Sequence, residues 1–140
     1  MSYLYVLIQG VLIVVIGMTS RFTTNPFIFA GLTGGLVLMA WSLRTMRLDN
    51  LNVFPDLKEK SRLVTWGPYR WIRHPMYSAV LLVTLMLVLT NLTLLRFGYW
   101  VILFVDLWLK FRYEESLLLK RYPEYAEYQR TTARLIPRVF

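Results

Sequence analysis

Apolar residues are gathered in four long runs, and this pattern predicts helices rather than strands. The runs cover residues 3–19, 27–43, 76–95 and 97–112. The third has 20 residues without a charged side chain, which is long enough for a helix to cross the hydrocarbon core of a bilayer. The fourth is apolar over a shorter stretch, but its helix can continue through Lys110 into the interface. We therefore expect an all-α integral membrane protein with about four transmembrane helices.

Proline residues predict where several helices begin and end. Asn25-Pro26 places a cap residue before a proline at the first helical position, and Pro75 is suited to open the third helix. Few residues separate the last two runs, so these should form a tight helical hairpin. Pro123 should end the fourth helix, and a second, short helix should follow with Glu124 in its first turn.

Two further patterns concern packing. Gly31 and Gly35 lie four residues apart on the second run, a spacing that favours close approach of another helix. Residues 49–66 mix apolar and charged side chains, so we expect this segment to lie on the membrane surface.

The composition agrees with a membrane protein and excludes several kinds of site. The chain has 140 residues, 56% of them hydrophobic, against roughly 45–50% in ordinary soluble domains. This length allows one domain, residues 1–140. The absence of cysteine excludes disulfides, thiolate metal ligands and cysteine nucleophiles. Because His74 is the single histidine, we also expect no metal site built from protein ligands.

The 16 Lys and Arg residues are distributed very unevenly around the predicted spans. Segments 44–73 and 110–138 hold seven each, which leaves two elsewhere. By the positive-inside rule, the loop 44–75, the tail 113–140 and both termini are cytoplasmic. This placement accounts for the net charge of +8, so we expect no nucleic-acid partner. The first run lacks a cationic stretch and a cleavage site, so we interpret it as a retained span.

The stretch 67–77 leads into the third span and carries the most suggestive polar chemistry. A helix opened by Pro75 leaves the backbone N–H groups of residues 76–78 free, and such a helix start binds carboxylate or phosphate groups. Arg73 can add charge-assisted bonds, and His74 can donate, accept or transfer a proton. The alternative is structural, with these side chains anchoring a span at the lipid headgroups.

Three acidic residues follow near the end of the fourth run. We expect the adjacent carboxylates of Glu114 and Glu115 to face different directions, with Lys110 and Arg112 as helical ion-pair partners. Alternatively, one of them binds an ammonium or hydroxyl group of a ligand. Asp106 is either functional, as ionisable residues within spans often are, or a structural partner of Lys110.

Two segments resemble the signatures of a known superfamily. The first is Leu63-Val-Thr-Trp-Gly-Pro-Tyr-Arg-Trp-Ile-Arg-His-Pro-Met-Tyr77. The second is Glu114-Glu-Ser-Leu-Leu-Leu-Lys-Arg-Tyr-Pro-Glu-Tyr-Ala-Glu-Tyr128, followed by Arg134-Leu-Ile-Pro137. Together they resemble the isoprenylcysteine carboxyl methyltransferase and phospholipid methyltransferase superfamily, and the short chain is similar to its small bacterial-type members.

The resemblance implies methyl transfer from S-adenosylmethionine to a carboxylate, amine or thiol of a lipophilic acceptor. The acceptor would be a lipid or a hydrophobic metabolite, reached at the cytoplasmic face of a bacterial inner membrane. By analogy, the catalytic residues are His74, Arg73 and Glu115. The cofactor would be held by a larger set, in which the last two tyrosines help to close the pocket: Tyr69, Arg73, His74, Pro75, Met76, Tyr77, Glu114, Glu115, Tyr125 and Tyr128.

Two other functions are compatible with the same residues. Membrane sterol reductases share a related C-terminal region and use NADPH, although they carry additional spans. A non-catalytic membrane protein that binds a lipid or another partner is the second alternative. The intact His74 and Glu114-Glu115 favour the methyltransferase over both.

Overall fold

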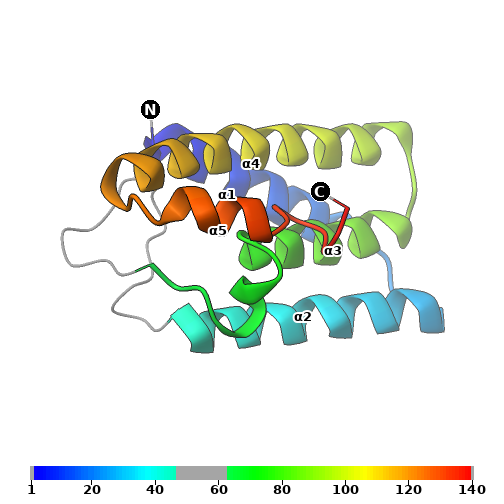
Figure 1. Ribbon diagram of the computed structural model, residues 1–140. Helices are drawn as coiled ribbons and strands as arrows, with labels where there is room; N and C mark the ends of the chain where they lie inside the picture. Colours follow the sequence, from blue (N-terminus) through cyan, green and yellow to red (C-terminus); the bar gives the residue numbers. More distant parts are fainter. Residues whose placement is uncertain (1, 47–62, 140) are drawn as a thin grey trace.

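The computed structural model describes residues 2–46 and 63–139, and within these ranges the regular elements are all helices, with no β-strand. Four long helices form a bundle, and a short fifth helix runs along its front, beside the C-terminal part of the fourth (Figure 1). The elements are α1 (Ser2–Met18), α2 (Pro26–Met46), the 3₁₀ helix η1 (Gly67–Arg70), α3 (Pro75–Leu89), α4 (Leu94–Arg121) and α5 (Tyr125–Thr131). The expectation that residues 49–66 lie on the membrane surface falls largely outside the described residues.

The predicted helix starts are confirmed. α2 begins at Pro26, and the Asn25 side chain accepts a hydrogen bond from the backbone N–H of Phe27 at 2.9 Å. Pro75 is the first residue of α3. α4 ends at Arg121, two residues before Pro123, because proline cannot continue the helical hydrogen bonding.

The boundary between the last two runs differs from the prediction. α3 ends at Leu89 instead of residue 95, and α4 begins at Leu94 instead of residue 97. The reason is a local cap, since the Thr93 side chain accepts a hydrogen bond from the backbone N–H of Arg96 at 3.2 Å. The tight hairpin is confirmed. α4 also extends well past residue 112, to Arg121.

The glycine pattern on α2 marks its contact with α3, as predicted. A Cβ atom added to Gly35 would lie 2.6 Å from Val83 Cγ2, and one added to Gly31 would overlap the Met86 side chain. Gly34 has open space around it, so it faces away from this contact. The two helices can approach closely because these two positions carry no side chain.

α1, α3 and α4 enclose the hydrophobic core, and the C-terminal tail adds one residue to it. Its buried members are Ile16, Leu81, Val88, Leu103, Leu107, Phe111 and Leu135. Phe111, on α4, extends this core to the polar end of the bundle, where its ring stacks on His74.

Arg96 closes the hairpin end of the bundle. Its side chain is almost completely buried and donates to the carbonyl groups of Ile16, Leu87 and Val88 at 3.0, 2.9 and 3.1 Å. It also donates to Thr19 Oγ1 and Ser20 Oγ at 3.0 and 2.9 Å. These carbonyls lie in the last turns of α1 and α3, where helices leave acceptors without a partner. One guanidinium thus joins three helix ends.

Asp106 and Lys110 both lie inside the bundle. Lys110 donates a hydrogen bond to Gln9 Oε1 on α1 at 3.3 Å. Asp106 is buried, and its Oδ2 atom has no hydrogen-bond partner among the described residues. Both interpretations of Asp106, a functional residue or a structural partner of Lys110, stay predictions.

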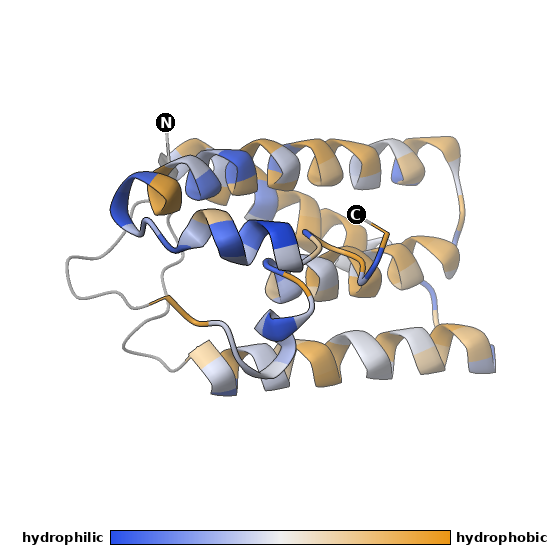
Figure 2. Cartoon of the chain, in the orientation of Figure 1, coloured by the Kyte–Doolittle hydropathy of each residue, from blue (hydrophilic) through white to orange (hydrophobic). Residues whose placement is uncertain are grey.

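The outer surface of the bundle is strongly apolar. Figure 2 shows hydrophobic residues along the long helices and hydrophilic ones gathered at the end formed by α5 and the C-terminal part of α4. Large exposed hydrophobic residues include Leu7, Val14, Phe29, Val37, Ile102 and Val105. Among the described residues, α2 is long and apolar enough to cross a membrane, while residues Tyr3–Met18 and Pro75–Leu89 form shorter apolar helices. The number of spans stays a prediction.

Candidate functional site

The C-terminal tail and the loop before α3 pair through their backbones. Ile72 and Ala133 form an isolated parallel bridge. The backbone N–H groups of Arg73 and His74 donate to the carbonyls of Ala133 and Arg134 at 2.9 and 3.0 Å. Ser78 Oγ, in the first turn of α3, donates to the Leu135 carbonyl at 2.6 Å. The tail therefore fixes the position from which the Arg73 and His74 side chains enter the bundle.

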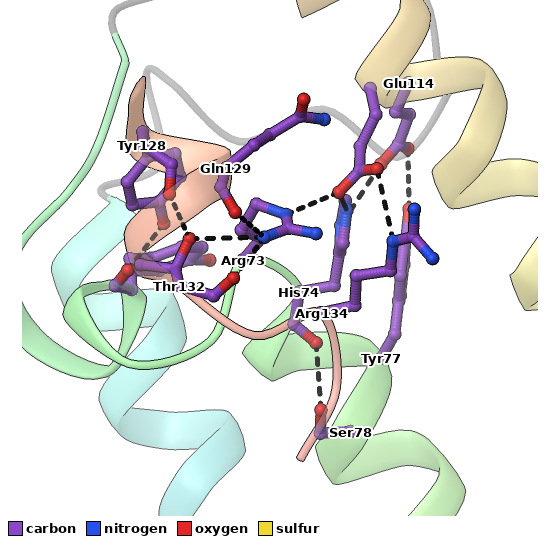
Figure 3. Close-up of polar contacts among 11 residues, drawn as sticks. Arg73, His74, Tyr77, Ser78, Glu114, Tyr128, Gln129, Thr132 and Arg134 are labelled. Atoms are coloured by element: carbon purple, nitrogen blue, oxygen red, sulfur yellow. Dashed lines mark hydrogen bonds and ion pairs between the residues drawn. The ribbon is translucent and has the colours of Figure 1, made fainter. Parts of the chain in front are cut away.

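Arg73 is the centre of a buried polar network (Figure 3). Its Nε donates to Glu115 Oε1 at 2.6 Å. Its Nη1 donates to the Gln129 carbonyl at 3.0 Å and also to the Thr132 carbonyl. The latter two groups lie at the C-terminal end of α5, so one guanidinium joins the end of α4 to the end of α5.

His74 lies between the two adjacent glutamates and between two aromatic rings. Its Nε2 is 3.3 Å from Glu115 Oε1, and its Nδ1 is 3.8 Å from Glu114 Oε2. The imidazole stacks on Tyr77 and Phe111, with ring centroids 5.4 and 5.2 Å away. The expectation that the carboxylates face different directions is wrong, because the imidazole inserts between them and both side chains reach it.

The two glutamates have opposite electrostatic environments. Burial raises the pKa of Glu114, and this effect exceeds the opposing influence of His74 and of the Tyr77 hydroxyl, which donates to Oε1 at 2.6 Å. Burial also acts on Glu115, but the hydrogen bonds and charges of His74 and Arg73 outweigh it and lower the pKa of Glu115 to about 2. Glu115 is therefore a fixed anion, whereas Glu114 can take up a proton more readily.

The partners of Glu115 come from distant parts of the chain. Besides Arg73 and His74, Arg134 Nε lies 3.6 Å from its Oε2 atom. The predicted helical partner, Arg112, is exposed and forms no recorded ion pair with Glu115. The i, i+3 spacing was misleading because Glu115 faces the bundle interior.

Three tyrosines predicted for the site lie together at its edge. Tyr69 and Tyr125 are buried, and the Tyr128 hydroxyl donates to the backbone carbonyl of Tyr69 at 2.5 Å. The rings of Tyr125 and Tyr128 are 5.6 Å apart. Burial raises the pKa of all three phenols, so they stay neutral at physiological pH. They join α5 to η1.

The start of α3 is partly as predicted. Met76 and Tyr77 have backbone N–H groups without a hydrogen-bond partner among the described residues. The Ser78 N–H is not free, because it donates to the His74 carbonyl at 3.1 Å as the first regular bond of the helix. Pro75 is buried, whereas Met76 is half-buried and has no recorded polar contact with the other predicted residues.

The family model for phospholipid methyltransferase matches residues 26–125. The chain belongs to the phospholipid methyltransferase family. This confirms the resemblance drawn from the two signatures, and it implies a methyltransferase that acts on lipid-like acceptors. No curated protein matches the chain closely enough to be counted as a relative.

The family match covers α2 to the first residue of α5. It includes the two segments that carry Arg73, His74, Glu114 and Glu115. It excludes α1 and the tail that pairs with Arg73. In this methyltransferase the ion-pair network is thus completed by residues beyond the match.

Sequence reasoning missed four contributors to the candidate site. Phe111 stacks on His74, Arg134 contacts Glu115, and Gln129 and Thr132 accept hydrogen bonds from Arg73. Arg134 lies in a signature segment and could have been found from it. The other three act through an apolar ring or a backbone carbonyl, for which the sequence carries no signal.

Among the described residues, no group of three or more acidic, histidine or cysteine side chains could hold a metal ion.

Proposed function

We propose that this protein transfers a methyl group from S-adenosylmethionine to a lipophilic acceptor at the cytoplasmic face of a bacterial inner membrane. The observation that carries the proposal is the convergence of Arg73-His74 and Glu114-Glu115 on one buried cluster. The two pairs lie on separate signature segments of a chain that belongs to a methyltransferase family. A cluster of charges at this depth costs folding free energy, which supports a functional role.

The residues present fit the polar part of the cofactor. The backbone N–H groups of Met76 and Tyr77 lack partners and suit its carboxylate. Glu114 Oε2 lies 3.8 Å from His74 Nδ1, and a carboxylate oxygen has two lone pairs, so it can also accept from the cofactor's ammonium group or ribose hydroxyls. The rings of Tyr69, Tyr125 and Tyr128 supply a wall for its apolar surface.

Arg73 and Glu115 have a different role in the proposal. Both side chains are buried and bonded to each other, and Glu115 also holds His74 Nε2. They therefore position the imidazole and the tail rather than react themselves. Alignment of this kind is what a displacement reaction requires, since its rate depends on holding the reacting atoms in line.

When bound, S-adenosylmethionine supplies an electrophilic methyl group and leaves as a neutral thioether. A carboxylate acceptor needs no base, whereas an amine or thiol must lose a proton. His74 is the candidate proton acceptor, because its ring nitrogens lie next to the carboxylates of Glu114 and Glu115, which stabilise an imidazolium. Phe111 and Tyr77 cover both faces of His74 and exclude water from it.

The proposal includes four membrane-spanning helices, α1 to α4, with both termini cytoplasmic. The support comes from the exposed apolar surface of the bundle, the charge asymmetry of the loops and the hydrophilic end that carries the cluster. An acceptor dissolved in the bilayer would approach the cluster between the helices, while the cofactor would enter from the cytoplasm.

The test is direct binding to the full chain purified in detergent. Calorimetric titrations with S-adenosylmethionine, S-adenosylhomocysteine and NADPH should give heat of binding for the first two ligands. His74→Ala should weaken S-adenosylhomocysteine binding while the protein stays folded. Binding of NADPH alone would overturn the proposal in favour of a reductase, and binding of none would favour a non-catalytic protein. Membrane extracts incubated with radioactive methyl donor would then identify the acceptor.

A further inference from the structure

A pocket lies next to the cluster, on the side of Arg73 that faces the tail. It encloses about 530 Å³ between η1, the C-terminal end of α5 and the chain's last described residues. Its lining residues are Arg70, Trp71, Arg73, Gln129, Arg130, Thr131, Thr132, Ala133, Arg134, Pro137, Arg138 and Val139. The site described above does not use most of them.

Five arginines surround this pocket, and none of its described lining residues is acidic. They come from η1, the following loop, α5 and the tail. Guanidinium groups gathered around a hollow repel one another, and a bound anion relieves that repulsion. The pocket therefore favours a negatively charged occupant.

The arginines are held in place to different degrees. Arg73 is fixed by its hydrogen bonds to Glu115 and Gln129 on the wall shared with the cluster, and Arg134 lies 3.6 Å from Glu115 Oε2. Arg70 lies over the Trp71 ring, 5.1 Å from its centroid. Arg130 is 81% exposed and contacts Glu127 at 3.8 Å, a weak exposed pair that leaves its side chain able to turn toward a ligand. The pocket thus has a rigid back and an adjustable rim.

We propose that this pocket binds a phosphate group. Guanidinium forks match phosphate oxygens, and a phosphate offers more acceptor atoms than a carboxylate to donors that approach from several directions. Trp71, Pro137 and Val139 add apolar surface beside the charges, which suits a phosphate attached to a lipid. A lipid headgroup and free phosphate present the same oxygens, and the experiment separates them. The proposal does not depend on methyl transfer.

The experiment uses the full chain in detergent and three probes. Calorimetry measures binding of inorganic phosphate, of dihexanoyl phosphatidic acid, and of dihexanoylglycerol, which lacks the phosphate. We expect both phosphate probes to bind and dihexanoylglycerol not to bind. Tighter binding of the phosphatidic acid identifies a lipid headgroup site, and equal affinity identifies a site for free phosphate. Failure of both phosphate probes to bind would overturn the proposal.

Variants of the rim test the location. Arg130→Gln with Arg138→Gln should weaken phosphate binding at least about tenfold, the loss expected for charge-assisted hydrogen bonds. Arg112→Gln, an exposed arginine of α4 outside the pocket, is the matched control and should leave the affinity unchanged. Equal losses in both would show unspecific attraction and overturn the site.

A competition measurement keeps this proposal separate from the previous one. S-Adenosylhomocysteine affinity should be the same with and without saturating phosphate, and the same in the rim variant. If phosphate displaced S-adenosylhomocysteine, the pocket would be part of the cofactor site. This result would overturn the proposal of a separate phosphate site. Absence of any S-adenosylhomocysteine binding would count against the methyltransferase proposal alone.

Discussion

Arg73 and Glu115 form a buried ion pair with an Nε–Oε1 distance of 2.6 Å, although 42 residues separate them in the chain. Their side chains are 6% and 7% exposed. Each charge is tolerated at this depth because the other is present, and the pair joins the loop before α3 to the end of α4.

Glu115→Gln should therefore destabilise the protein strongly. It leaves the Arg73 guanidinium buried without its counter-ion, a change that typically costs about 3–5 kcal/mol. Thermal unfolding in detergent should show a clearly lower midpoint. Glu127→Gln is the control, because Glu127 is 72% exposed in its pair with Arg130 and should shift the midpoint little. Similar shifts for both variants would contradict a special role for the buried pair.

Stability should depend on pH through both glutamates, with opposite signs. The pKa of Glu115 falls from 4.5 to about 2 on folding, so its contribution, roughly 3 kcal/mol, is present above pH 4.5 and is lost as the pH falls toward 2. The pKa of Glu114 is raised, so its contribution is present below pH 4.5 and is lost as the pH rises through the folded value.

Unfolding midpoints of the parent and two variants between pH 3 and 7 check these signs. The difference in unfolding midpoint between Glu115→Gln and the parent should be smallest at the acidic end. Glu114→Gln should show the reverse, with its relative stability greatest at neutral pH. Parallel curves for all three proteins would contradict the assigned environments.

Glu114→Gln should reduce S-adenosylhomocysteine affinity by about tenfold or more, because it removes the charge proposed to hold the ammonium or ribose group. Since the 2.6 Å ion pair with Arg73 belongs to Glu115, the variant should remain folded. Calorimetry gives the affinity, and the unfolding midpoint gives the stability. Ser116→Ala, on the exposed side of the same helix turn, should bind normally. Full affinity in Glu114→Gln would remove Glu114 from the cofactor site.

Arg96→Met should lower the free energy of unfolding by about 3–5 kcal/mol while S-adenosylhomocysteine affinity is retained in the folded fraction. The buried carbonyls at the ends of α1 and α3 would lose their donor, but the cluster lies at the opposite end of the bundle. Arg21→Gln, an exposed arginine at the same end, should change neither quantity. Loss of affinity at full stability would show an unexpected connection between the two ends.

Gly35→Val should destabilise the α2–α3 contact by about 1–3 kcal/mol, because the added atoms collide with Val83. Gly34→Ala should have the opposite effect and stabilise α2 by up to about 1 kcal/mol. The space around Gly34 is open, and alanine has a higher helix propensity than glycine. Unfolding midpoints of the two variants measure both effects. Equal destabilisation would mean that the two helix faces are packed alike.

The parts of the fold that the sequence predicted correctly depend on local chemistry. Pro26 and Pro75 mark helix starts by the geometry of their own residues, and Gly31 and Gly35 mark a helix contact by their spacing. The end of α3 was misplaced because the Thr93 cap interrupts an apolar run without changing its hydropathy.

The arrangement of the site was predictable only in outline. Adjacent helical residues point about 100° apart, so Glu114 and Glu115 were expected to diverge. Their side chains are long enough for both to reach an imidazole that enters between them from another segment. The contacts of Arg73 with Gln129 and Thr132 use backbone carbonyls, which look the same in every sequence.

The pairing of residues 71–74 with residues 133–134 also has a consequence for biosynthesis. The loop that carries Arg73 and His74 is made early, but the carbonyl groups that fix it belong to Ala133 and Arg134, near the last described residues. The cluster therefore takes its final shape only after the tail has been synthesised. A nascent chain that lacks this tail would also lack the backbone acceptors that position Arg73 and His74.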